Sequence, residues 1–218
     1  MKVTTDACIL GSWTPLPQGP ARVLDIGTGT GLLALMLAQR GQAIYIDAIE
    51  IEGQAASQAA ENIANSFAAE NIKVLHGDVK TYAASVPYNL IVSNPPFFVK
   101  SLHSHGAEKT LARHTASLPF EDLLAACDRN LAPEGYVSVL LPTTESGHLR
   151  EIATARGWST IQILSIQHQP HSEVKRQVTL LSKIPVAAVL EEILVIYNEG
   201  KTYSAQFKKL MQQFYLDF

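Results

Sequence analysis

The chain has 218 residues, a length that suits one domain with a sizeable core. Hydrophobic residues make up 47% and charged residues 17%, and the net charge of −3 excludes a global field that would attract nucleic acid. Cys8 and Cys127 are too few and too far apart for a disulfide framework or a metal cluster. The chain shows no charged-then-apolar leader and no run of about 18 apolar residues. We therefore expect a cytoplasmic protein that spans no membrane, holds no metal ion and is a monomer.

The predicted elements alternate between apolar strands and helices along the chain. Residues 1–21 are mixed and contain several prolines and glycines. Continuous apolar runs predict strands over 22–26, 43–50, 72–76, 88–93, 136–141, 158–167 and 177–182, with 193–197 as a further candidate. Helical spacing predicts helices from the glycine-rich segment to about Arg40 and over 53–66, 119–131, 144–156 and 203–214.

This alternation predicts the fold class. Apolar strands that alternate with helices indicate a parallel sheet with both faces covered. We predict an α/β, Rossmann-like, doubly wound and mostly parallel seven-stranded sheet, with an antiparallel edge hairpin around the polar turn 168–175. We expect one domain over 1–218: an N-terminal segment (1–21), a core (22–141) and a C-terminal part (142–218) that completes the sheet and ends in a closing helix.

A glycine-rich segment follows the first predicted strand. Gly27-Thr28-Gly29-Thr30-Gly31 lets the backbone approach a ligand, and the helix behind it favours negative charge. A dinucleotide-binding loop would need G-x-G-x-x-G, but residue 32 is Leu, so the spacing is G-x-G-x-G. Asp25 would repel a diphosphate, whereas it can pair with the ammonium of an amino acid. The loop therefore argues against a nicotinamide dehydrogenase.

Two further acids end the next predicted strands. Glu50, about 20 residues after the loop, suits the hydroxyls of a ribose. Asp78, with Val79 beside it, can accept a hydrogen bond from an adenine amino group. Ligands of open parallel sheets bind at these carboxyl ends. An amino acid, a ribose and an adenine in series describe S-adenosylmethionine, although each acid alone is more often a solvated strand end.

The segment Asn94-Pro95-Pro96-Phe97 ends another predicted strand. The prolines have a fixed φ and donate no N–H, and the residue before a proline is extended. An amide oxygen, a proline carbonyl and an aromatic face are then held together, which suits a flat group that carries an NH₂. Taken alone, the segment is as consistent with an ordinary turn after a strand.

The loop that follows is locally basic. We expect Phe97 and Phe98 to contact a base, and Lys100 and Arg113 to contact phosphates. The alternative is a solvated loop. Lys175 and Arg176 are expected to lie on a solvated face.

Two segments carry a resemblance to a known family. Residues Val23 to Gly31 and Val92 to Phe97 resemble the class I S-adenosylmethionine-dependent methyltransferases that act on amino groups. More narrowly, the chain is similar to the bacterial tRNA1(Val) adenine-37 N6-methyltransferase family over nearly its whole length. The narrower likeness lies in 1–6, 9–13, 31–40 and the ending 203–216. The resemblance implies that Thr5 and Asp6 lie near the cofactor, because the N-terminal segment of this family folds over it.

The resemblance also implies a reaction and a partner. The methyl group would pass from S-adenosylmethionine to the N6 amine of an adenine in tRNA, with Asn94, Pro95, Pro96 and Phe97 as the catalytic segment and Asn94 also near the cofactor. Family members usually carry a Phe- and Gln-rich segment before the match to Met1, so we expect part of a lid to lie outside this chain. A protein-glutamine N5-methyltransferase, an rRNA guanine-N2 methyltransferase and a binding module without activity remain alternatives.

Overall fold

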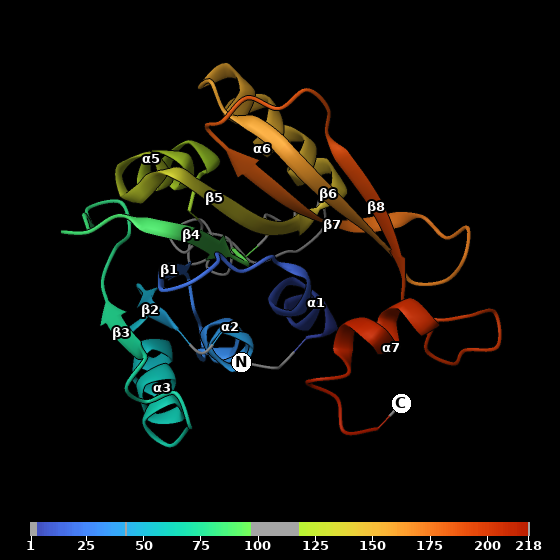
Figure 1. Ribbon diagram of the computed structural model, residues 1–218, viewed down its shortest axis with the longest axis horizontal. Helices are drawn as coiled ribbons and strands as arrows, with labels where there is room; N and C mark the ends of the chain where they lie inside the picture. Colours follow the sequence, from blue (N-terminus) through green and yellow to red (C-terminus); the bar gives the residue numbers. More distant parts are fainter. Residues whose placement is uncertain (1–3, 42, 97–117, 218) are drawn as a thin grey trace, which may run out of the picture.

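The computed structural model describes residues 4–41, 43–96 and 118–217 (Figure 1). The elements in chain order are α1 (Thr5–Trp13), β1 (Ala21–Ile26), α2 (Leu32–Arg40), β2 (Ile44–Glu50), α3 (Gly53–Ala64), β3 (Ile72–His76), β4 (Tyr88–Ser93), α5 (Phe120–Asn130), β5 (Leu131–Pro142), α6 (Thr143–Ala155), β6 (Ser159–Gln167), β7 (Val174–Ser182), β8 (Leu190–Val195) and α7 (Ala205–Met211).

The described strands form one eight-stranded sheet in the order β3-β2-β1-β4-β5-β7-β6-β8. Only β7 runs against its neighbours β5 and β6, and the other pairs are parallel. The mostly parallel sheet and the β6–β7 hairpin are therefore confirmed, but the predicted number of seven strands is one too few. The eighth strand, β8, pairs with β6 at the outer edge, and four of its six residues are exposed, so it lacks the continuous apolar run of a buried strand.

Helices cover both faces of this sheet (Figure 1). Helices α5 and α6 pack on one face, where Leu124 and Leu149 join a core cluster with Ile91 of β4. Helices α1, α2, α3 and α7 lie on the other face, where Leu37 of α2 packs with Val23 of β1. Alternating side chains of one strand thus enter different cores, which is the reason that the central strands are apolar along their whole length.

The register brings the ends of four parallel strands together. Ile26 of β1 is the partner of Ile49 in β2 and of Ser93 in β4, and Glu50 pairs with His76 of β3. The residues that follow these strands therefore leave the sheet side by side. The strand order also reverses direction between β1 and β4, and such a switch point is where open α/β sheets bind ligands.

Helix α1 was not predicted from the sequence. Its stretch contains Thr, Gly and Ser, which are weak helix formers, and its apolar residues form no clear stripe. Burial stabilises it instead, because every residue from Ala7 to Ser12 is buried. Gly11 allows the close approach of α2, since a Cβ at that position would lie 2.9 Å from Sδ of Met36.

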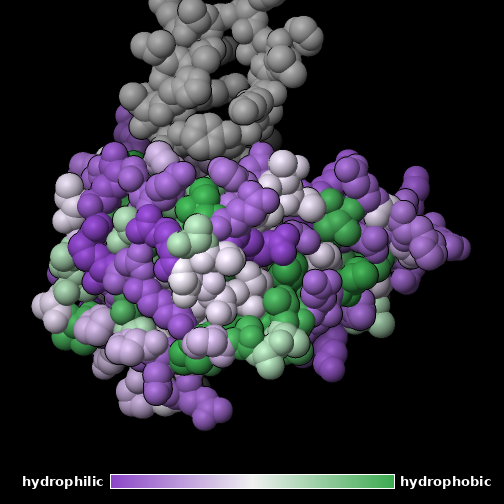
Figure 2. Space-filling model, turned by 90° about the horizontal axis from the view of Figure 1, so that it is seen from above, coloured by the Kyte–Doolittle hydropathy of each residue, from purple (hydrophilic) through white to green (hydrophobic). Residues whose placement is uncertain are grey.

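The face shown in Figure 2 is largely hydrophilic, with smaller hydrophobic spots between the polar side chains, as is usual for a protein surface. In the part of the chain that the structure describes, no helix is long and apolar enough to cross a membrane.

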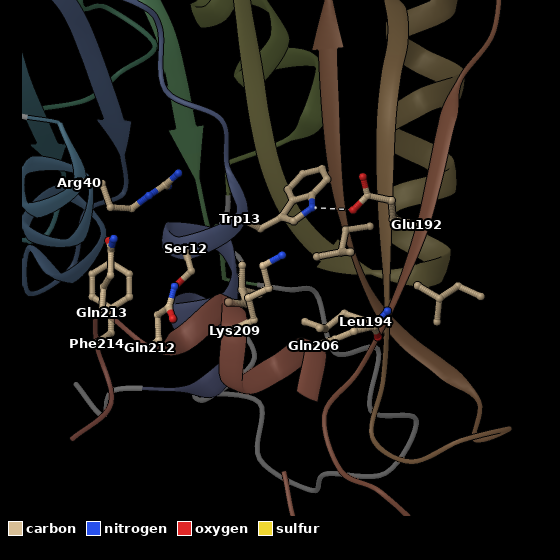
Figure 3. Close-up of a pocket in the computed structure, with 13 residues that line it drawn as sticks. Ser12, Trp13, Arg40, Glu192, Leu194, Gln206, Lys209, Gln212, Gln213 and Phe214 are labelled. Carbon is tan, nitrogen blue, oxygen red and sulfur yellow. Dashed lines mark hydrogen bonds between the residues drawn. The ribbon is translucent and has the colours of Figure 1, made fainter. Parts of the chain in front are cut away.

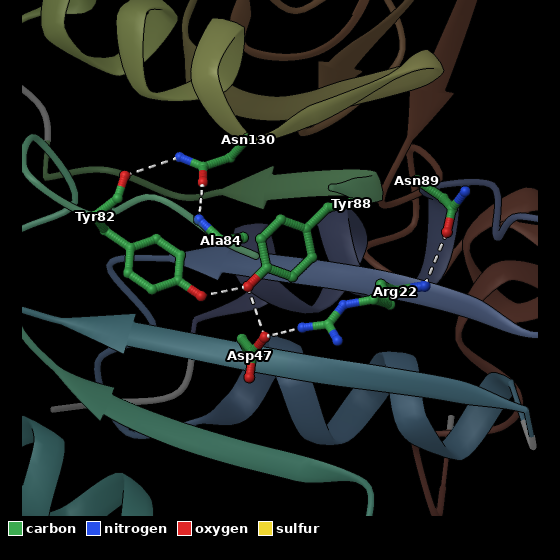
Figure 4. A network of polar contacts seen from close by, with 7 residues as sticks. All are labelled: Arg22, Asp47, Tyr82, Ala84, Tyr88, Asn89 and Asn130. Carbon is green, nitrogen blue, oxygen red and sulfur yellow. Dashed lines mark hydrogen bonds and ion pairs between the residues drawn. The ribbon is translucent and has the colours of Figure 1, made fainter. Parts of the chain in front are cut away.

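A polar network joins β1, β2 and β4 away from the carboxyl ends (Figure 4). The Tyr88 hydroxyl donates to Oδ2 of Asp47 at 2.6 Å, and Nη2 of Arg22 reaches the same oxygen at 2.6 Å. The Tyr82 hydroxyl lies 2.6 Å from that of Tyr88 and donates to it, since the Tyr88 proton is already given to Asp47. Burial, first of all, raises the pKa of Tyr88 well above its usual range, so its hydroxyl stays protonated and donates.

Replacing Tyr88 by Phe is expected to destabilise the protein more than replacing Tyr82 by Phe. Tyr88→Phe removes two hydrogen bonds from a fully buried position, whereas Tyr82→Phe removes one bond from a half-buried position. We expect a loss of about 1–3 kcal/mol in the free energy of unfolding for Tyr88→Phe. Urea unfolding of both variants measures the difference, and equal losses would contradict the central position of Tyr88.

Candidate active site

A cavity of about 540 Å³ lies at the carboxyl ends of the parallel strands. Its walls come from the ends of β1 to β4, the start of α1 and the start of β7. The lining residues are Thr4, Asp6, Ile26, Gly27, Ile49, Glu50, Ile51, Glu52, Gly77, Asp78, Val79, Lys80, Ser93, Asn94, Pro95, Pro96, Leu118 and Arg176.

The glycine loop forms part of this wall. Gly27, Gly29 and Gly31 all have positive φ angles, of 71°, 60° and 84°, which side chains rarely adopt. The backbone N–H of Gly27 donates to the carbonyl of Ile49 at 2.9 Å, so the loop begins as a continuation of the sheet. A Cβ on Gly27 would meet no atom within 4 Å, because that side of the residue faces open space. The loop therefore exposes bare backbone to a ligand.

Asp25 lies beneath the glycine loop rather than in the cavity. Its side chain is fully buried, and Oδ2 accepts a hydrogen bond from the Thr28 hydroxyl at 2.5 Å. Oδ1 is buried without a hydrogen-bond partner among the described residues. Burial raises the pKa of Asp25 to about 7, and the charge of Glu50 acts in the same direction, whereas Thr28 and the N–H of Ala34 act against it.

Glu50 connects the loop to the cavity wall. Its Oε2 accepts from the N–H of Gly29 at 2.9 Å, and its Oε1 accepts from the N–H of Glu52 at 3.0 Å. A carboxylate has more acceptor positions than these two bonds use, so Glu50 retains the capacity to accept from hydroxyl groups of a ligand.

Asp78 lies at the end of the neighbouring strand. Its Oδ1 accepts from the N–H of Lys80 at 2.9 Å, and its Oδ2 lies 3.6 Å from Nζ of Lys80. These contacts orient the carboxylate, which is still partly exposed at the cavity wall.

The end of β4 lies beside the glycine loop, because β4 is the sheet neighbour of β1. The buried Ser93 hydroxyl donates to the carbonyl of Ile26 at 2.9 Å, which joins the two strand ends. Asn94 is partly exposed, and Asn94, Pro95 and Pro96 all line the cavity. The Asn94 side-chain amide and the Pro95 carbonyl thus lie near the glycine loop, although the two segments are far apart in sequence.

The structure brings together most, but not all, of the residues predicted from sequence. Asp6, Gly27, Glu50, Asp78, Val79, Asn94, Pro95 and Pro96 line the cavity, whereas Thr5, Asp25, Thr28, Gly29 and Gly31 are not among its lining residues. Phe97, Phe98, Lys100 and Arg113 lie outside the described residues. The sequence reasoning missed Arg176, which was expected on a solvated face, because no local pattern shows that β7 folds back toward the cavity.

A second groove of about 390 Å³ lies between α1, α7 and β8 (Figure 3). Several of its polar side chains bind within the fold: Nε1 of Trp13 donates to Oε2 of Glu192 at 3.2 Å. Nη1 of Arg40 donates to the carbonyls of Gly11 and Thr14 at 2.6 and 2.7 Å. The groove lacks the glycine loop and the strand ends, so we assign the active site to the first cavity. No cluster of three or more metal-ligating side chains occurs in 4–41, 43–96 and 118–217.

Comparison with known proteins shows the family of the chain. The family model described as methyltransferase small domain matches residues 14–136. A tRNA1(Val) (adenine(37)-N6)-methyltransferase from Dyadobacter fermentans is 40% identical over 221 residues, which cover 100% of this chain and 92% of the relative. The chain belongs to this methyltransferase family.

Solved structures agree on the fold of the methyltransferase. A protein from Agrobacterium tumefaciens described as a predicted O-methyltransferase superposes with a TM-score of 0.76 at 18% identity, covering 96% of both chains. An S-adenosylmethionine-dependent methyltransferase from Thiobacillus denitrificans, solved with S-adenosylhomocysteine, superposes with a TM-score of 0.51 at 18% identity, covering 74% of this chain and 66% of that one.

The cavity of the methyltransferase fits S-adenosylmethionine. The open space at Gly27 admits a ligand against the backbone, and the carboxylates of Glu50 and Asp78 stand on successive strand ends. Acceptors of this kind suit the hydroxyl and amino groups of an adenosine, and the apolar side chains of Ile26, Ile49 and Val79 suit its flat ring.

Replacing Gly27 by Ala is expected to block the cavity. Gly19 offers a matched control, because it has a φ of 72° and open space around it but does not line the cavity. Each Gly→Ala change should cost about 1–2 kcal/mol of stability through its left-handed backbone. Only Gly27→Ala should weaken S-adenosylhomocysteine binding, by about tenfold or more, which corresponds to a loss of about 1.4 kcal/mol. Titration calorimetry measures the dissociation constant of S-adenosylhomocysteine for each variant. Equal dissociation constants for Gly27→Ala and Gly19→Ala would exclude contact of the cofactor at Gly27.

Asp25 is expected to make stability depend on pH. The folded protein keeps the proton up to a pKa of about 7, whereas the unfolded chain releases it near 3.8. Folding takes up a proton between these values, so stability should fall as the pH rises from about 4 to 7. Asp25→Asn should reduce this fall by about 4 kcal/mol, since the pKa rises by about three units, from 3.8 to about 7, and each unit corresponds to about 1.4 kcal/mol. Urea unfolding of both proteins without cofactor gives the two pH profiles, and parallel profiles would contradict the raised pKa.

Proposed function

We propose that this methyltransferase transfers the methyl group of S-adenosylmethionine to the N6 amine of adenine 37 in tRNA1(Val). The main support for this function is that the segment Asn94-Pro95-Pro96 lines the same cavity as Gly27 of the glycine loop, Glu50 and Asp78. A relative that carries this activity in its name is 40% identical over the whole chain.

The cofactor would be held along the strand ends. Glu50 accepts hydrogen bonds from the ribose, and Asp78 with Val79 receives the adenine. Bare backbone at Gly27 lies against the methionine part, while Asp25, Thr28, Gly29 and Gly31 keep the loop in place. Thr5 and Asp6 close this end of the site from α1. The bound cofactor supplies a methyl group on a positively charged sulfur.

The end of β4 would position the acceptor. The lone pair of an adenine N6 amine is delocalised into the ring, so the amine is a poor nucleophile. The side-chain oxygen of Asn94 and the carbonyl of Pro95 each accept one N6 proton, which holds the nitrogen in line and stabilises the charge that develops on it. The proton leaves after transfer, so no strong general base is needed.

Contacts to RNA would come from the segment after Pro96. Phe97 and Phe98 stack on the flipped-out base, which is worth roughly 1–3 kcal/mol per base, and Lys100 and Arg113 bind phosphates. The enzyme would act in the cytoplasm and as a monomer.

The direct test uses purified protein, labelled S-adenosylmethionine and unmodified total tRNA. N6-methyladenosine in the digested tRNA, restricted to the tRNA1(Val) fraction, is the expected product. N2-methylguanosine, or label in protein glutamine instead of RNA, would replace this proposal by one of the two related reactions that the same Asn-Pro-Pro segment suits.

Asn94→Ala is expected to abolish transfer and to leave the cofactor bound. Loss of the acceptor oxygen should lower kcat by about 100-fold or more, the usual cost of removing one preorganised group. The dissociation constant for S-adenosylhomocysteine should stay close to the wild-type value, because the glycine loop and Glu50 are unchanged. Single-turnover assays and calorimetry measure the two quantities, and wild-type turnover by the variant would exclude the proposed role.

A further inference from the structure

Arg176 brings a positive charge into the wall of the cavity. It lies near the start of β7, and the register pairs it with Pro142 at the carboxyl end of β5. Because β7 is antiparallel, its first residues lie at the edge of the sheet where β1 to β4 end. Nε of Arg176 lies 3.4 Å from Oδ2 of Asp6 in the first turn of α1.

The strand order places Arg176 on the substrate half of the cavity. Apart from Thr5 and Asp6 of α1, the residues that line the cavity and are assigned to the adenosine come from the ends of β1, β2 and β3, which lie on one side of β4. Arg176 comes from β7, which lies beyond β5 on the other side of β4. Asn94, at the end of β4, therefore stands between the cofactor residues and Arg176. A ligand that contacts Arg176 enters from the side opposite the adenosine.

The charges of the wall give this arginine a distinct role. Among the described residues that line the cavity, the acids are Asp6, Glu50, Glu52 and Asp78, and the cations are Lys80 and Arg176. Lys80 lies at the β3 end, beside Asp78. On the substrate half of the cavity, Arg176 is thus the one described cation that a nucleic-acid backbone approaching Asn94 would meet. The planar guanidinium of an arginine can bind two phosphate oxygens at once.

We propose that Arg176 binds a phosphate of the RNA backbone beside the target nucleotide and exchanges its contact with Asp6 for that phosphate when the RNA docks. This inference rests on the proposed function. Both side chains are partly exposed, at 31% for Arg176 and 34% for Asp6, so the exchange needs no opening of the core. Asp6 lies in the first turn of α1, where the helix end stabilises its negative charge after Arg176 moves.

The test compares Arg176→Gln, Arg176→Lys and the control Lys175→Gln. Lys175 is the exposed neighbour of Arg176 in β7 and does not line the cavity, so the control removes an equal charge outside the site. Binding of unmodified tRNA1(Val) is measured by filter retention at several salt concentrations. Steady-state methylation and calorimetry with S-adenosylhomocysteine complete the set.

Arg176→Gln is expected to raise KM for tRNA by about tenfold and to change kcat by less than about threefold. The slope of log K against log salt should decrease in magnitude by about 0.7 to 0.9, the value for one phosphate contact. Arg176→Lys should retain that slope, because the charge remains, but bind less tightly, because the bidentate geometry is lost. Lys175→Gln should match wild type, and all variants should bind S-adenosylhomocysteine equally.

Three results would overturn the inference. Weaker S-adenosylhomocysteine binding by Arg176→Gln, with unchanged tRNA binding, would assign the arginine to the cofactor carboxylate. An unchanged salt slope and unchanged KM would assign Arg176 a structural role. A wild-type protein that methylates no tRNA would overturn the proposed function as well, and this outcome differs from the other two because it appears without any substitution.

Discussion

Two carboxylates hold the glycine loop, and the active site is arranged around that loop. Asp25, from the buried strand β1, accepts from the Thr28 hydroxyl, and Glu50, from β2, accepts from the N–H of Gly29. Three glycines with positive φ would lose much conformational freedom on folding. Because both carboxylates stand on strands within one sheet, the loop is fixed relative to the sheet, and the bare backbone at Gly27 has a defined position before any ligand binds.

Burying the Asp25 carboxyl costs free energy of folding. A fully buried carboxyl with one unpartnered oxygen disfavours its charged form, which is the reason for its raised pKa. Such a group contributes to the geometry of the loop rather than to stability at neutral pH. Residues that lower stability at the point where a ligand binds are a common feature of functional sites.

Helix α1 links the cavity to the C-terminal part of the chain. Its first turn provides Thr4 and Asp6 to the cavity, while its last turns pack on α2 and α7, where the Ser12 hydroxyl contacts Sδ of Met211. Since α1 is stabilised by burial and not by its own helix propensity, the elements that bury it also keep its first turn at the cavity. The edge strand β8 and helix α7 thus support the site although neither lines the cavity.

Apart from helix α1, the order of strands and helices can be predicted from the amino-acid sequence, as can the mostly parallel sheet, the hairpin and the family. Their signals are local: continuous apolar runs predict buried parallel strands, and Gly27 to Gly31 or Asn94 to Phe97 are contiguous segments with fixed backbone consequences. Asp25, Glu50 and Asp78 could be named as acids near a cofactor for the same reason, since each follows or ends an apolar run.

Only the tertiary structure shows those features of the site that depend on strand register and burial. Asp25 lies under the loop while Glu50 lines the cavity, because Asp25 is level with Ala48, two residues before Glu50 at the carboxyl end of β2, although both side chains face the same side of the sheet. Helix α1 lacks an apolar stripe because it is buried on nearly all sides. Strand β8 gave only the candidate 193–197, because its first four residues are exposed. Arg176 enters the site because β7 runs antiparallel and returns its first residues to the carboxyl edge, which is a property of chain topology and not of the residues around it.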